Sequence, residues 1–159
     1  MRKLLLAVRP VVFLVTGCAH QISENSRALA DRTIAFAKLR EDPDAYRGKF
    51  VVLGGVIAAV KDVQEGTQLE VVQYELDSRE TPDETSVSGG RFLAVTTDFL
   101  EMSTCKPGAV ISLAGAVAGK QAQLLQGGEY IYPVIVIKEL HFLKVGDEQF
   151  FRTWNPYGP

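Results

Sequence analysis

The clearest chemistry in this chain belongs to a run of small residues that ends in a cysteine, namely Val15, Thr16, Gly17 and Cys18. The run follows a short apolar stretch, an order typical of the site at which bacterial lipoproteins are lipidated on the cysteine and cleaved before it. Arg2 and Lys3 supply the positive charge that opens such leaders. The motif therefore predicts a diacylglyceryl group on Cys18, a second acyl chain on the new amino terminus, and stable anchoring to a membrane.

The apolar stretch before the motif, residues 4–14, is too short to cross a bilayer, which needs about 20 residues. Arg9 and Pro10 interrupt it, and an arginine at the centre of an inserting helix costs about 2.5 to 3.5 kcal/mol. Inefficient export, or a translation start elsewhere, therefore stays open. The alternative to a leader is an apolar strand or helix of a cytosolic protein, but charge, length and small-residue order favour the leader.

Cys105 is the second thiol, and Lys106 beside it could favour a reactive thiolate. A cysteine nucleophile with His141 as its base is one hypothesis, although the sequence gives no proximity between them. An unused loop cysteine is the favoured interpretation. With Cys18 lipidated, the chain has no second thiol for an intramolecular disulfide and no cysteine-based zinc site.

The two histidines, His20 and His141, are too few for a dedicated metal site. Glu139 and His141 share one face of a predicted strand, about 7 Å apart, and a solvent-facing polar pair is favoured over a base and its orienter. Glu70 and Glu75 differ in strand parity and are not assigned to a glycosidase pair. The sequence therefore predicts no metal, no cofactor and no catalytic residue.

Side chains that could bind a ligand or partner are mostly aromatic, since small barrels bind oligonucleotides or sugars on such rings. The candidate surface comprises Tyr74, Arg91, Phe92, Tyr130, Tyr132 and Trp154. Packing in or against the core is nevertheless the default for the rings, and a surface ion pair is the default for Arg91.

Charge bears on the class of partner. The chain has 17 basic and 19 acidic residues, and removal of a 17-residue leader leaves 14 basic ones and a formal charge of −5. This balance disfavours phosphate-rich partners, so no nucleic-acid partner is expected. The 142 residues that remain suit a single domain.

The elements divide the chain into four segments. Residues 1–17 are expected to form the leader, 18–32 a polar tether, 33–144 a β domain and 145–159 a tail rich in aromatic residues, glycine and proline. The tail either packs over an apolar end of the domain or forms an exposed strap, and packing is favoured.

Within the β domain, residues 42–48 carry the signals of one helical turn, and β-branched runs from Phe50 onwards predict five strands bent at glycines. The pair Gly54–Gly55 suggests a bulge or a sharp bend, and an extra residue is expected near Val71. A short helical turn is expected after Asp98. The fold class is mainly β, a small five-stranded OB-like barrel with short helical turns; a two-sheet β-sandwich is the alternative.

Several motifs in this order resemble a known family. They are the cysteine motif, Pro43-x-x-Tyr46-x-Gly48-Lys49, Gly54-Gly55, Leu69-Glu70-Val71-x-Gln73-Tyr74-x-Leu76-Asp77, Gly90-Arg91-Phe92-Leu93, Gly115-x-Val117-x-Gly119 and Tyr130-x-Tyr132-Pro133-Val134. Together they resemble the Slp family of Gram-negative outer-membrane lipoproteins. The resemblance implies a palmitate-bearing anchor in the outer membrane of the cell envelope, a periplasm-facing body and a link to starvation or stationary-phase stress.

The same resemblance supplies no catalytic residues, so a non-catalytic role in binding or in supporting the envelope is expected, with an envelope protein or a glycan as partner. An OB-type binder of a periplasmic oligosaccharide is the alternative, and a thiol enzyme using Cys105 is less favoured.

Overall fold

The computed structural model describes residues 20–101 and 103–144. In that part of the chain three short helices precede or flank five strands. The helices are α1 (Glu24–Leu29), α2 (Phe36–Glu41) and the 3-10 helix η1 (Pro43–Tyr46); the strands are β1 (Phe50–Val63), β2 (Gly66–Gln73), β3 (Gly90–Thr96), β4 (Val110–Leu125) and β5 (Gly128–Lys144).

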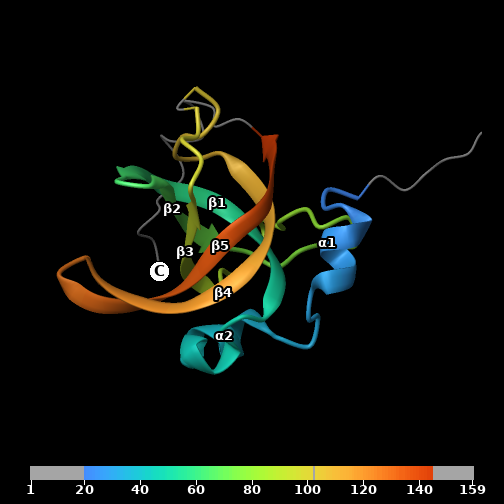
Figure 1. Cartoon of the computed structure of the whole chain (residues 1–159), viewed down its shortest axis with the longest axis horizontal. Coiled ribbons are helices and arrows are strands. Elements are labelled where there is room, and N and C mark those ends of the chain that lie inside the picture. The colour runs from blue at the N-terminus through green and yellow to red at the C-terminus, as the bar shows by residue number, and fades with distance from the viewer. Residues whose placement is uncertain (1–19, 102, 145–159) are drawn as a thin grey trace, which may run out of the picture.

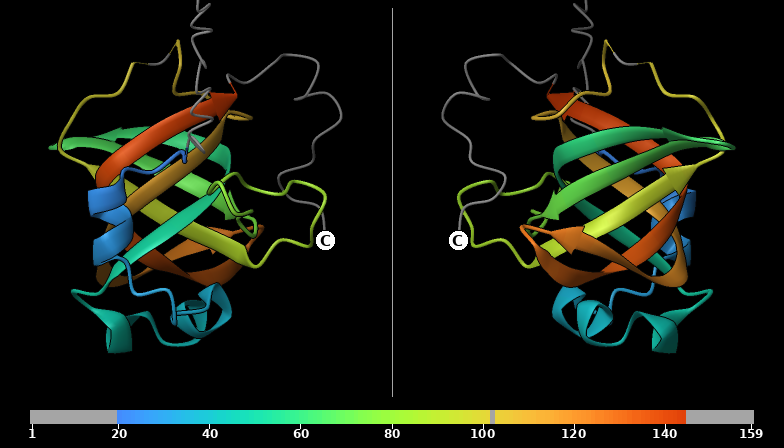
Figure 2. Two further views of the ribbon diagram at one scale, coloured as in Figure 1. Left: turned by 90° about the vertical axis from the view of Figure 1, so that its right-hand side faces the viewer. Right: turned by 90° about the vertical axis from the view of Figure 1, so that its left-hand side faces the viewer.

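The five strands close into one barrel in the order β1-β2-β3-β5-β4 (Figure 2). All neighbours are antiparallel except β3 and β5, which run parallel from Leu93↔Val134 to Val95↔Val136. The parallel pair is what allows a five-stranded sheet to close on itself with this order. The mainly β, closed-barrel prediction is confirmed, and the two-sheet alternative is not what forms.

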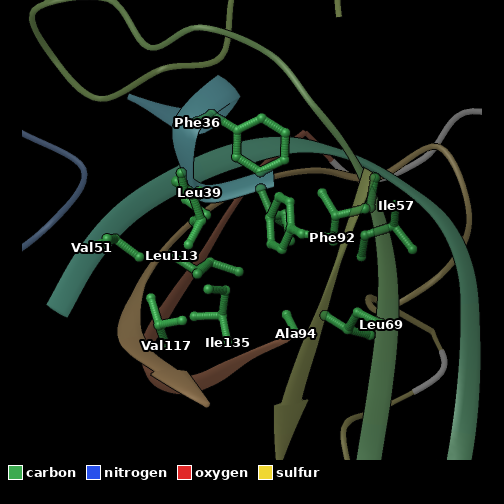
Figure 3. Packing of buried hydrophobic residues seen from close by; sticks show 14 of the residues in the cluster. Phe36, Leu39, Val51, Ile57, Leu69, Phe92, Ala94, Leu113, Val117 and Ile135 are labelled. Carbon is green, nitrogen blue, oxygen red and sulfur yellow. The ribbon is translucent and has the colours of Figure 1, made fainter. Parts of the chain in front are cut away.

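Alternate residues of every strand point into the barrel, because strand side chains have period two. Figure 3 shows this core; its members from the strands include Val51, Ile57, Leu69, Phe92, Leu113 and Ile135. Helix α2 covers one end of the barrel with Phe36 and Leu39, and the Phe36 ring meets Phe92 edge-on at a centroid distance of 6.0 Å. The loop after β3 supplies Cys105 and Ala109 to the same core.

The extra residue expected in β2 lies instead in its neighbour. The β1–β2 register shifts between Ile57 and Ala59, opposite Val71 and Glu70, while β2 pairs with β3 without interruption. Gly55 does not lie in the bulge of β1. A Cβ on Gly55 would lie 1.9 Å from the carbonyl oxygen of Val72 on the neighbouring strand. Glycine is thus required for close approach of two backbones.

Strands β4 and β5 form a long hairpin that projects from the barrel (Figure 1). Gln126 and Gly127 form its turn, with φ of 51° and 82°, and Leu125 pairs with Gly128. Pro133 pairs with Lys120 of β4, and pairing of β5 with β3 begins only at Val134. Proline therefore stands just before the stretch in which β5 is paired on both sides.

Three segments outside the strands complete the described fold. The described part of the expected tether, residues 20–32, contains α1 and the buried Ile22. The loop between β2 and β3 turns back through a Leu76–Pro82 bridge and buries Glu80. No helix follows Asp98 within the described residues 97–101 and 103–109.

Candidate functional site

A polar cluster spans β2, β3 and β5 on the outside of the barrel. Each member of the cluster lies an odd number of positions from a core residue on its own strand, so its side chain faces outward. Glu70 precedes Val71, Arg91 precedes Phe92, and Tyr132 lies three positions before Ile135. Arg91 Nη1 donates to Glu70 Oε1 at 2.7 Å, and the Tyr132 hydroxyl donates to the same oxygen at 3.0 Å. One carboxylate therefore ties together three neighbouring strands.

Two of the three cluster members are buried, and the Glu70 side chain is 19% exposed. Tyr132 is 1% exposed and Arg91 is buried. Burial, together with Glu70, raises the pKa of Tyr132 well above its ordinary value. The ring of Tyr130 lies 4.5 Å from that of Tyr132, and its hydroxyl accepts the backbone N–H of Arg91 at 2.9 Å. In barrels of this order the outer face of the second and third strands is where ligands bind; here the chain's own side chains fill part of it.

The predicted candidate surface is thus brought together only in part. Arg91, Tyr130 and Tyr132 meet, whereas Phe92 lies in the core and Tyr74 is half-buried at the end of β2. Arg91 forms a buried ion pair in place of the expected surface pair. Trp154 lies outside the described residues, as do the cysteine motif and its lipidation site, residues 15–18.

Cys105 is not an activated thiol in this structure. It is 1% exposed, packs in the core and forms no disulfide. Burial, with a smaller contribution from Asp62, raises the pKa of the Cys105 thiol to about 11. The predicted effect of Lys106 is outweighed, because removing the thiolate from water costs more than a neighbouring cation returns.

Glu139 and His141 do meet, at 2.7 Å between Glu139 Oε1 and His141 Nε2. The Glu139 carboxylate is already occupied: it accepts the Ser23 N–H at 2.8 Å, the Ser23 hydroxyl at 2.6 Å and the Ser26 hydroxyl at 2.5 Å. Burial opposes ionisation of this group, but the hydrogen bonds from the serines outweigh it and lower the pKa of Glu139 to about 2. So acidic a carboxyl is a poor general base at neutral pH.

A groove lies on another side of the barrel, between the segment leading into α2 and the loop that follows β2. It consists of two adjoining hollows of about 320 and 400 Å³ that share Ile34, Val52 and Leu76. Asp31, Arg32 and Glu80 line the first hollow, and Phe36 and Val87 line the second. The groove thus has an apolar floor and a charged end, a combination suited to an amphipathic ligand.

The sequence prediction missed this groove because a returning loop builds it. One signal was present in Gly54: a Cβ there would lie 2.7 Å from Leu76 Cδ2 and 2.8 Å from Pro82 Cγ. Glycine at this position lets the loop press onto β1. The groove contains none of the predicted site residues.

No group of three or more histidine, cysteine or acidic residues is arranged to hold a metal ion in the part of the chain that the structure covers. Among these same residues, no helix has the length and hydropathy needed to cross a membrane.

A closed five-stranded barrel with this strand order is of the OB type. The chain matches the outer membrane lipoprotein Slp family over residues 15–158. This protein therefore belongs to the Slp family of outer membrane lipoproteins, as the motifs indicated. The match begins at the first residue of the cysteine motif and extends through nearly all of the aromatic tail.

Solved structures with a similar fold are single-stranded DNA-binding proteins. The mitochondrial protein of S. cerevisiae has a TM-score of 0.42 and 14% identity, covering 63% of this chain and 99% of its own. The small protein of Streptomyces coelicolor has a TM-score of 0.34 and 11% identity, covering 60% and 94%. The Plasmodium falciparum protein, in complex with single-stranded DNA, has a TM-score of 0.35 and 14% identity, covering 62% and 95%. No curated protein matches the chain.

These neighbours correct one sequence-based expectation. Nucleic acid was excluded as a partner on charge, yet the solved structures that resemble this chain are single-stranded DNA-binding proteins. The exclusion therefore does not stand. At this identity the likeness concerns the fold alone and assigns no ligand to this chain.

Proposed function

We propose that this protein is a non-catalytic binding module, held on the periplasmic face of the outer membrane by lipid on Cys18. The observation that carries the proposal is the family match, which begins within the leader and includes Cys18. Three acyl chains on one residue give effectively permanent attachment, since each buried CH₂ contributes about 0.8 kcal/mol. The proposed maturation leaves residues 1–17 behind as a leader and exposes the OB-type barrel to the periplasm.

The absence of catalysis is part of the proposal. It is supported by the described side chains that could react, because they are buried or already hydrogen-bonded. The Cys105 thiol is buried with a raised pKa, and the Glu139 carboxylate is ionised and hydrogen-bonded. Glu70 already accepts from Arg91 and Tyr132. Neither Cys105 nor Glu139 is therefore poised to exchange a proton near neutral pH.

Lipidation is tested by growing cells that express the full chain with labelled palmitate and separating their membranes. Labelled protein in the outer-membrane fraction is expected, and a Cys18→Ala variant should lose the label. A Cys105→Ala variant is the matched control and should keep it. Equal distribution of the wild type and Cys18→Ala between soluble and membrane fractions would remove the proposal.

The binding part is tested on the groove. Ala37 is exposed on α2 and lines the second hollow, so Ala37→Trp should fill it without disturbing the core. Ala45→Trp, at an exposed position of η1 away from the groove, is the control. Periplasmic oligosaccharides and single-stranded oligonucleotides are the probes, read by thermal shift. A probe that stabilises the wild type and Ala45→Trp but not Ala37→Trp would identify the groove as its site; no shift with any probe would count against a binding module of these classes.

We extend the proposal to starvation and stationary-phase stress, which the family resemblance suggests. Cells lacking the protein should lose viability faster than their parent during prolonged stationary phase, and the wild-type chain should restore it. Identical survival of the two strains would remove this extension and leave the anchoring proposal intact.

A further inference from the structure

The chain just after the proposed lipid site is fastened to the barrel. Gln21 donates its backbone N–H to the Arg79 carbonyl at 3.1 Å, and Asp31 donates to the Phe50 carbonyl at 2.8 Å. Between them Ile22 is 1% exposed. Figure 1 shows α1 lying against one side of the barrel. This segment is therefore part of the folded body from Gln21 onwards.

Two carboxylates hold α1 in place. Glu139 of β5 accepts three hydrogen bonds from Ser23 and Ser26, at the first turn of the helix. Glu80 lies 3.3 Å from Arg27 Nε and 3.6 Å from an Arg32 nitrogen, with its own side chain nearly buried. The Arg27–Glu80 pair is screened less by solvent than an exposed pair, whereas the Arg32 side chain is itself exposed. The segment is thus fixed at both of its ends.

The stretch of chain between the lipid and this segment is very short. Only Ala19 and His20 separate Cys18 from Gln21. Three consecutive Cα steps span at most about 11 Å. A flexible tether over residues 18–32 would instead have a mean reach of roughly 20 Å and would let the barrel turn freely.

We propose that the lipid on Cys18 moors the barrel in one orientation, with the surface around Gln21 and Arg79 against the phospholipid headgroups. The proposal rests on Cys18 lipidation and adds the orientation to it. The exposed guanidinium of Arg79 suits headgroup phosphates. The β4–β5 turn lies at the opposite end of the molecule's longest axis from α1 and points away from the bilayer (Figure 1).

The test uses the full lipidated protein in phosphatidylethanolamine–phosphatidylglycerol vesicles that contain a nickel-chelating lipid. A nitroxide is attached at Arg79→Cys or, as the matched control, at Leu124→Cys near the hairpin turn, where the native side chain is 82% exposed. Broadening by nickel falls steeply with distance, so we expect it to be at least about five-fold greater at position 79 than at position 124.

A third variant distinguishes a fixed orientation of the barrel from simple closeness of the whole barrel to the vesicle. Twelve glycine and serine residues inserted between Ala19 and His20 leave the fold untouched but lengthen the free chain. This insertion should remove the difference between positions 79 and 124. Equal broadening in the original protein would overturn the mooring. Flotation of the same samples with the vesicles reports lipidation, so a failure of the anchor is recognised separately.

Discussion

Glu70 is the acceptor on which the outer face of the barrel depends, because Arg91 and Tyr132 both donate to one of its oxygens. Removal of one partner leaves a charge with little access to water, at a cost of about 3 to 5 kcal/mol. Arg91→Ala should therefore lower the free energy of unfolding by about that amount, measured by urea denaturation. Arg79→Ala is the control: its ion pair with Asp77 is long and exposed, so it should cost under about 1 kcal/mol. Equal losses in the two variants would contradict the role of the cluster.

Glu139 makes stability depend on pH. Its folded pKa of about 2 lies below the ordinary value of a glutamate, so its contribution is complete above about pH 5 and is lost as the pH falls towards 2. The loss should be about 2 kcal/mol, less than the full shift implies, because the side chain remains 19% exposed. Glu139→Gln should flatten the stability profile between pH 5 and 2, whereas Glu129→Gln, on the exposed hairpin turn, should leave its slope unchanged.

Cys105 should be inert in the folded protein. A thiol with a pKa of about 11 is ionised about 100-fold less at pH 8 than a free cysteine, and burial blocks approach as well. In a shortened chain that starts at Ala19, where Cys105 is the single cysteine, iodoacetamide should react at least about 100-fold faster in urea than in buffer. Reaction in buffer at the rate of free cysteine would restore the nucleophile hypothesis.

At the scale of single residues, the sequence predicted which side chains share a strand face better than it predicted which side chains are buried. Lys106 next to Cys105 suggested an activated thiol, and only the packing of the β3–β4 loop into the core shows otherwise. The Glu139–His141 pair was correctly placed on one strand face. Its partners Ser23 and Ser26 lie more than 100 positions away, at a separation that no local pattern reveals.

Among the elements, the strands were predictable because their side chains alternate and their turns carry glycine. The helices were less so: α1 has six residues, too few for a hydrophobic period to stand out, and is positioned by Glu139 and Glu80. The β1 bulge was assigned to the wrong strand, because a parity change shows that a residue is inserted in a pair but not on which side.

Substitution of Gly119 tests how tightly η1 is held against β4. It has φ of 115°, and a Cβ there would lie 2.3 Å from Arg47 Cζ, whose guanidinium donates to the Ala118 carbonyl. Gly119→Ala should therefore cost about 2 kcal/mol. Gly127→Ala is the matched control, since its φ of 82° is also positive but nothing lies within 4 Å, and it should cost about 1 kcal/mol. Equal unfolding midpoints for the two variants would show that the Arg47 side chain moves aside at no cost in stability.

For the molecule as a whole, the segment before β1 decides where the domain begins. A chain starting at Arg32 loses the buried Ile22 side chain and uncovers Glu80 and Glu139. Compared with a chain starting at His20, it should be less stable by about 3 to 5 kcal/mol in urea unfolding. Matching midpoints would mean that residues 20–31 are a tether after all, as their polar composition suggested.

The fold class was within reach of the sequence, since five glycine-bent strands have few ways to close. The groove was not, because Val52 and Leu76 come together only when a loop folds back over β1. The aromatic candidates did not form one exposed platform for a different reason: Phe92 packs inside the barrel, and Tyr132 is buried on the outer face beside Glu70 and Tyr130.

Closure of the barrel has a consequence for crowding. Proteins held on a membrane meet one another in two dimensions, at local concentrations far above those of free diffusion, and open sheet edges would then recruit neighbouring copies into ribbons. Here each strand of the barrel has partners on both sides, and the hairpin beyond it carries Lys120, Gln121 and Gln123 along β4. Under the proposed lipid anchoring, closely spaced copies would therefore present few open sheet edges to one another.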